Sequence, residues 1–109
     1  MTVKIHVEVF IAAQLLARRQ ETFTAKELRR EIEERFGDTR PGVQTHISAH
    51  CVANARRNAA TVYNYLWRLE PGLLRPFETD RDNPHPSRVS AAAFPRIEDV
   101  PSAYMDLFF

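Results

Sequence analysis

Residues 23–58 read FTAKELRREIEERFGDTRPGVQTHISAHCVANARRN, and this stretch decides the fold of the chain. It opens with a capping box, in which the Thr24 hydroxyl accepts from the Glu27 amide while the Glu27 carboxylate accepts from the Thr24 amide. Apolar residues then recur at intervals of four along one face, and Gly37 suits a helix end. The pattern predicts a helix over 25–36, with Phe23 and Leu28 at the two positions of a hydrophobic staple.

The second half of the stretch predicts another helix, from Val43 to about Asn54, after a connector in which Pro41 stands where a helix can start. Helical numbering places Val43, Ile47, His50, Cys51 and Asn54 in one sector, which we expect to face the core. The opposite face is small and uncharged, whereas ordinary exposed helices carry Lys and Glu. This face, formed by Thr45, Ser48, Ala49 and Val52, is typical of a helix that lies close against a partner.

Upstream, residues 3–9 alternate between apolar and polar as a strand does, but residues 10–19 have helix-forming composition and spacing. We favour one helix through most of Val3–Arg19, with a strand over residues 1–9 as the alternative. Downstream, residues 62–69 are rich in aromatic and β-branched types, and Glu70-Pro71-Gly72 is a turn signal. Residues 73–77 can return antiparallel, which predicts a β-hairpin in which Pro76 lies at an unpaired edge.

Residues 78–101 contain four prolines and predict irregular structure. The apolar residues that follow, from Tyr104 to Phe109, predict an ordered segment with a helical turn or two. We therefore expect a winged-helix domain over 1–78. Residues 79–109 would form an extended C-terminal arm, packed on the domain or on a second subunit.

Composition and charge are those of one small globular domain: 109 residues, 44% hydrophobic, 27% charged and a net charge of +1. The charge is unevenly distributed, because residues 40–77 hold five arginines against a single acid, Glu70. A local excess of positive charge is typical of surfaces that bind polyanions. The lone Cys51 predicts a reducing, intracellular setting, and the interrupted apolar pattern of the first ten residues does not resemble a signal peptide. We expect a cytoplasmic protein without a membrane span.

The expected order of helix, short extended corner, helix, connector, helix and hairpin is that of a winged helix-turn-helix domain, an α+β fold. The chain also resembles a small, largely uncharacterised winged helix-turn-helix family of bacteria and archaea, often encoded beside restriction or other defence genes. The resemblance spans about residues 10–86. It is carried by FTAKEL at 23–28, RPGVQTHISAHCVAN at 40–54, YLWRLEPGLLRPF at 65–77 and the segment from Asp80 to Pro84 followed by His85. It implies the fold and a link to defence systems, and it brings no established biochemical role.

A domain of this type would bind double-stranded DNA with its third helix in the major groove and its hairpin, the wing, on the backbone. Gln, Ser and Thr can contact base edges, and a small Ala can accept a thymine methyl group. Arginines at the helix ends suit phosphates, which position the protein without specifying sequence. The predicted contacts are Arg40, Gln44, Thr45, His46, Ser48, Ala49, Arg56 and Arg57, with Arg68 and Arg75 on the wing. Arg68 and Arg75 can instead pair with Glu70 or Glu78. The prediction is a transcriptional regulator or the targeting component of a defence system, with a homodimer through Tyr104–Phe109 to extend a small footprint.

Other functions have weaker support in the sequence. The same helix face could bind another protein, in a module without nucleic-acid binding. His46 and His50 are four apart, with Cys51 and His85 as further ligand types, but no second cysteine pair or His-Glu-x-x-His motif accompanies them. We expect packing roles there, and we expect Tyr63, Tyr65 and Trp67 to form hairpin core rather than a platform for unpaired bases. No phosphate loop, paired acid and base, or nucleophile motif is present, so we predict no enzyme activity, no cofactor and no metal.

Overall fold

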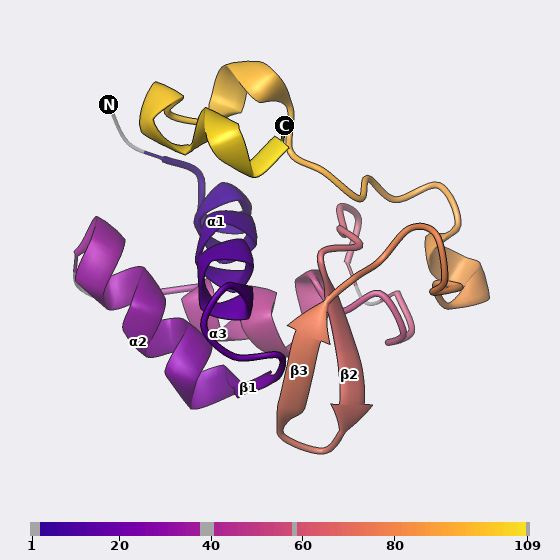
Figure 1. The fold of residues 1–109 in the computed structure, drawn as a ribbon. Helices are drawn as coiled ribbons and strands as arrows, with labels where there is room; N and C mark the ends of the chain where they lie inside the picture. The colour runs from indigo at the N-terminus through magenta and orange to yellow at the C-terminus, as the bar shows by residue number, and fades with distance from the viewer. Residues whose placement is uncertain (1–2, 38–40, 58, 109) are drawn as a thin grey trace.

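The computed structural model describes residues 3–37, 41–57 and 59–108 (Figure 1). It is an α+β fold with a three-stranded antiparallel sheet of strand order β1-β3-β2. Its elements are α1 (Ile5–Ala17), β1 (Phe23–Thr24), α2 (Ala25–Phe36), α3 (Val43–Thr45), the π-helical turn η1 (His46–His50), β2 (Leu66–Glu70), β3 (Leu73–Pro76) and the 3-10 helices η2 (Pro86–Arg88), η3 (Ile97–Asp99) and η4 (Ser102–Phe108).

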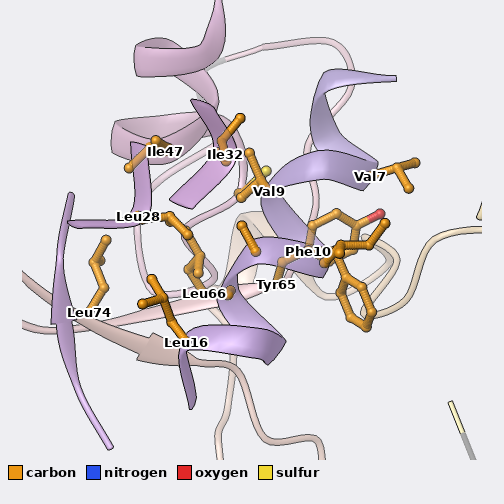
Figure 2. Close-up of a cluster of buried hydrophobic side chains, with 14 of the residues drawn as sticks. Val7, Val9, Phe10, Leu16, Leu28, Ile32, Ile47, Tyr65, Leu66 and Leu74 are labelled. Carbon is orange, nitrogen blue, oxygen red and sulfur yellow. The ribbon is translucent and has the colours of Figure 1, made fainter. Parts of the chain in front are cut away.

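Helix α1 forms the centre of the molecule, and the prediction of a helix rather than a strand is confirmed. Figure 1 shows it running between α2, the hairpin and the C-terminal turns. Consecutive residues from Val7 to Ala13 are buried, so this helix is enclosed on every side. A helix that is enclosed on all sides does not need a polar face with helical spacing. The alternation of apolar and polar residues at its start is therefore compatible with a helix. Figure 2 shows Val7, Val9 and Phe10 among core side chains from the other elements.

Helix α2 has the predicted bounds, and its capping box is confirmed. The Glu27 amide donates to Thr24 Oγ1 at 3.1 Å, and the Thr24 amide donates to Glu27 Oε1 at 2.9 Å. Phe23 and Leu28, the staple residues, are both buried. Helix α2 therefore starts where its own sequence dictates and lays Leu28 and Ile32 against α1 (Figure 2).

The third helical segment is shorter than predicted. It ends at His50 rather than near Asn54, and its second half is a π-helical turn closed by the Cys51 amide on the His46 carbonyl at 3.0 Å. The physical reason is pairing with the chain that enters β2. The Ala53 amide donates to Leu66 O at 2.7 Å, and the Leu66 amide donates to Cys51 O at 2.8 Å. Backbone groups used in this way cannot continue a helix.

The same pairing corrects the predicted outward face. Val52 forms a parallel bridge with Leu66 and is fully buried, so its assignment to the outer surface is wrong. Thr45 and Ser48 are exposed as expected, and Ala49 is half-buried. Burial of Val43, Ile47 and Cys51 is confirmed.

The predicted hairpin is confirmed, with β2 and β3 antiparallel around Pro71-Gly72. Gly72 has φ 83°, a left-handed conformation that side chains other than glycine rarely adopt. Strand β3 lies between β2 and β1, but β1 pairs only with Leu73 and Leu74. Pro76, at the end of β3, consequently has no partner on the β1 side. Trp67 is half-buried, with its ring beside Phe77 and under the Arg75 guanidinium.

The C-terminal residues pack on their own chain. Tyr63 forms a bridge with Ala92, and Val100 is buried in the core. Helix η4 lies beside the first turns of α1 at the top of Figure 1, where Tyr104 contacts the ring of Phe36. Among the described residues, no helix is long and apolar enough to cross a bilayer.

A buried ion pair joins the hairpin to the arm. Arg75 donates from both terminal nitrogens to the Asp82 carboxylate, each at 2.7 Å, and the Glu78 amide donates to the same carboxylate at 2.8 Å. The Arg75 bonds, followed by the Glu78 amide, hold the pKa of Asp82 below its usual range. Both side chains are largely buried, so the loss of one partner would leave the other charge without compensation.

We predict that Asp82→Asn lowers the free energy of unfolding by about 3 kcal/mol at neutral pH, measured by urea denaturation. Asp80→Asn is the matched control, because Asp80 is an exposed acid of the same loop, and its effect should stay within about 0.5 kcal/mol. A depressed carboxylate pKa stabilises the fold above the unfolded pKa of about 3.9, and this contribution is lost as pH falls through the folded pKa. Asp82→Asn should therefore also lose less stability than the wild type below about pH 4. Equal stability of the two variants would contradict this account of the ion pair.

Candidate nucleic-acid interface

The third helical segment, 43–50, presents a short polar surface fixed from below by apolar anchors. Gly42 starts it with φ 97°, and Val43 and Ile47 are fully buried against α1 and α2. Gln44, Thr45 and Ser48 are exposed on the other side. Because the anchors fix the rotation of the segment, the identity of the exposed side chains follows from the burial of the apolar ones.

Gln44 has a partner that the sequence analysis did not identify. Arg29 of α2 donates from Nη1 to Gln44 Oε1 at 3.0 Å, so the amide nitrogen of Gln44 remains as a donor. Only the packing of α2 across the third segment, which no local pattern encodes, brings this cation to the candidate surface.

The predicted arginines differ in what they contact. Arg56 and Arg57 are exposed, and Arg57 donates to the backbone carbonyls of Ala59, at 3.1 Å, and of Ala60. Arg68 on β2 donates from Nη2 to Ser48 O at 2.6 Å, which ties the hairpin to the third segment. Arg40 lies outside the described residues.

Arg75 does not belong to this surface. Its guanidinium is bound to Asp82 and lies over the ring of Trp67, with its carbon 5.6 Å from the ring centroid. The sequence predicts Glu70 or Glu78 as a partner of Arg75, whereas its partner in the structure is Asp82. A cation bound bidentately in a buried pair is not available to a phosphate.

The histidines and the cysteine have packing contacts. His46 is half-buried, with Nδ1 2.8 Å from Gly42 O and its ring edge-on to His50 at 4.7 Å. Cys51 is buried, and this burial raises the pKa of its thiol. His85 Nδ1 lies 2.7 Å from Ser87 Oγ. In the part of the chain that the structure describes, no three His, Cys, Asp or Glu side chains gather as metal ligands would.

A groove of about 360 Å³ separates the third segment from the hairpin turn. Ile47 and Leu74 form its apolar wall, and Ser48 and Arg68 stand beside them. The chain from Pro41 to Leu69, which forms the third segment, the loop behind it and most of β2, contains no Asp or Glu. This surface can attract an anion and donate hydrogen bonds to it. Its groove can hold the less polar part of a ligand, such as the sugar of a nucleotide.

Comparison of the chain with protein-family models, with curated proteins and with solved structures finds no match.

A half-buried histidine lies in the first turn of α1. His6 Nδ1 lies 3.0 Å from the Tyr65 hydroxyl, and its ring stacks on Tyr63 with centroids 4.1 Å apart. Burial, and then the positive charges of His46 and Lys4, lower the pKa of His6 to about 4. Protonation at mildly acidic pH therefore favours the unfolded chain, whose histidine has a pKa of about 6.5.

We predict that the free energy of unfolding falls as pH is lowered from about 6.5 to 5, because the unfolded state takes up a proton that folded His6 does not. The contribution of one such group is at most about 1.4 kcal/mol per pH unit. Urea unfolding at several pH values should show a shallower dependence for His6→Asn than for the wild type. An imidazole titration of His6 followed by NMR gives the independent check, and a midpoint near 6.5 would contradict the account.

Proposed function

We propose that this chain is a winged helix-turn-helix protein that binds duplex DNA, with residues 43–50 in the major groove and the β2–β3 hairpin on the backbone. The element order α1-β1-α2-α3-β2-β3 and the sheet order β1-β3-β2 support the winged-helix part of the proposal. In such a domain the third helix and the hairpin face the same ligand. Arg68, which joins β2 to Ser48, would hold these two elements together.

One observation supports the proposal more than any other: the exposed polar side chains of the third segment lie between cations, on a stretch without acids. Arg29 stands on one side of Gln44, Arg68 stands beside Ser48, and Arg56 and Arg57 follow the segment. In such an arrangement the cations supply affinity, because contacts with phosphates position the protein on DNA of any sequence. The neutral side chains between them supply selectivity, because contacts with base edges discriminate between sequences. We assign Gln44, Thr45 and Ser48 to base edges and the arginines to phosphates.

The biological setting follows from the resemblance described above, and we propose a transcriptional regulator or the targeting component of a defence system. The proposal assigns no reaction, cofactor or metal to the chain. A module this small has a small footprint, so a second copy or a tethered partner would raise its affinity.

We predict that the protein binds a duplex at low salt and that the logarithm of its association constant falls linearly with the logarithm of salt concentration. About four phosphate contacts give a slope near −3.6. Replacement of Arg56 and Arg57 by Ala together should reduce the slope by about 1.8 and weaken binding at low salt at least roughly tenfold. Fluorescence anisotropy with a labelled duplex measures both quantities.

The matched control replaces Arg81 and Arg96 by Ala, which removes the same charge from exposed positions of the arm. This control should bind like the wild type. Gln44→Ala with Ser48→Ala should leave the salt slope unchanged and reduce discrimination between sequences. If the wild type fails to bind any duplex at low salt, the DNA proposal is overturned in favour of a protein-interaction module. If both double-arginine variants lose affinity equally, the assignment of Arg56 and Arg57 to the interface is overturned.

A further inference from the structure

Among the described residues, Arg88 is the largest fully buried side chain, and its sequence context predicts no role for it. Its guanidinium donates to four backbone carbonyl oxygens: Nε to Ala55 at 2.6 Å, Nη1 to His50 at 3.0 Å and Tyr63 at 3.1 Å, and Nη2 to Ala49 at 2.6 Å. All of its side-chain partners within the described chain are backbone carbonyls. A buried cation is costly unless its hydrogen bonds are made, so this geometry constrains every group it touches.

The residues around Arg88 contact the same loop. The His85 amide donates to Ala53 O at 2.9 Å, and Ser87 Oγ accepts from the Arg57 amide at 2.8 Å. We call residues 85–88 the clasp. It lies along the loop that leaves the third segment, 51–57, and touches that loop at Ala53, Ala55 and Arg57.

The chemistry of the clasp requires arginine. The carbonyls of Ala49 and His50 belong to the last turn of the third segment, where they also accept from the backbone amides of Val52 at 3.3 Å and Tyr63 at 2.8 Å. A planar guanidinium offers five donors in fixed directions and can serve carbonyls from separate segments, whereas a lysine ammonium offers three donors at one point. Loss of the guanidinium would remove one donor from each of the four carbonyls, and the loop would have to open for water to replace it.

The loop held in this way ends in Arg56 and Arg57, the exposed cations of the candidate interface. We infer that the clasp is a positioning device for that interface, with Arg88 as the positioning residue that fixes Arg56 and Arg57 relative to the third segment; this inference rests on the proposed function. Arg88 is fully buried and cannot touch DNA itself. Any effect of its replacement on DNA binding must act through the backbone that it holds, in the loop and in the last turn of the third segment.

The test combines two variants with two measurements. Arg88→Lys keeps the charge and removes the planar fork, and Ser87→Ala removes the exposed hydroxyl that accepts from the Arg57 amide. Arg96→Lys is the control, because Arg96 is an exposed arginine of the same arm that pairs with Glu98. Amide hydrogen exchange reports the order of the loop without DNA, and anisotropy with a labelled duplex reports affinity and salt slope.

In Arg88→Lys, we expect amides of 52–57 to exchange at least about tenfold faster, while amides of α2 change less than about twofold. Duplex affinity should fall at least about fivefold, and the salt slope should decrease by about one, because the loop arginines are no longer fixed. In Ser87→Ala, the Arg57 amide should exchange at least about threefold faster, with a smaller loss of affinity. Arg96→Lys should match the wild type in both measurements.

A combined variant tests whether Arg88 acts through Arg56 and Arg57. When Arg88→Lys is combined with Arg56→Ala and Arg57→Ala, the losses should be less than additive, because both changes remove the same contacts. If Arg88→Lys does not fold, Ser87→Ala alone decides the question. Absence of duplex binding by the wild type overturns the proposed function. Wild-type binding with unchanged loop exchange and unchanged affinity in the folded variants overturns the inference about the clasp and leaves the proposed function standing.

Discussion

Four carbonyl oxygens from the third helical segment, the loop behind it and the approach to β2 converge on the buried guanidinium of Arg88. Their shared requirement for a donor links parts of the chain that are up to 39 residues apart. A single unsatisfied buried carbonyl costs about 1–3 kcal/mol, a large part of the net stability of a domain this size. The end of the third segment, the loop 51–57 and the clasp are therefore one structural unit. The arm that carries Arg88 belongs to the fold for the same reason.

Pairing with the chain that enters β2 explains why the third segment is short and why its exposed face is smaller than its sequence predicts. Helical periodicity from Val43 extends to Asn54, and each residue is compatible with a helix. Pairing of residues 51–53 with Leu66 ends the helix earlier and buries Val52. What remains for a partner is Gln44, Thr45 and Ser48, with cations on both sides. On a surface this small, the proposed binding of DNA would depend on the placement of each arginine.

Elements defined by local chemistry were predictable from the sequence, and elements defined by distant contacts were not. The capping box at Thr24 and Glu27 determined the bounds of α2, and Pro71-Gly72 located the hairpin, because both signals act within a few residues. The pairing of Arg75 with Asp82, the contact of Arg29 with Gln44 and the burial of Arg88 depend on the tertiary arrangement. An arginine that will be buried among carbonyls looks the same in sequence as one that will face a phosphate. For this reason the sequence indicated the helix of the candidate site, and the structure was needed to show which arginines lie beside it.

The most direct measurement of the central proposal is a map of backbone amide shifts by NMR while an unlabelled duplex is added to the protein at low salt. We predict that the largest changes fall on Gln44, Ser48, Arg56, Arg57 and the hairpin turn at Gly72. The amides of η3 and η4, which lie beside the first turns of α1 at the top of Figure 1, should keep their chemical shifts. Changes centred on η3 and η4, or no changes at any residue, would contradict the account.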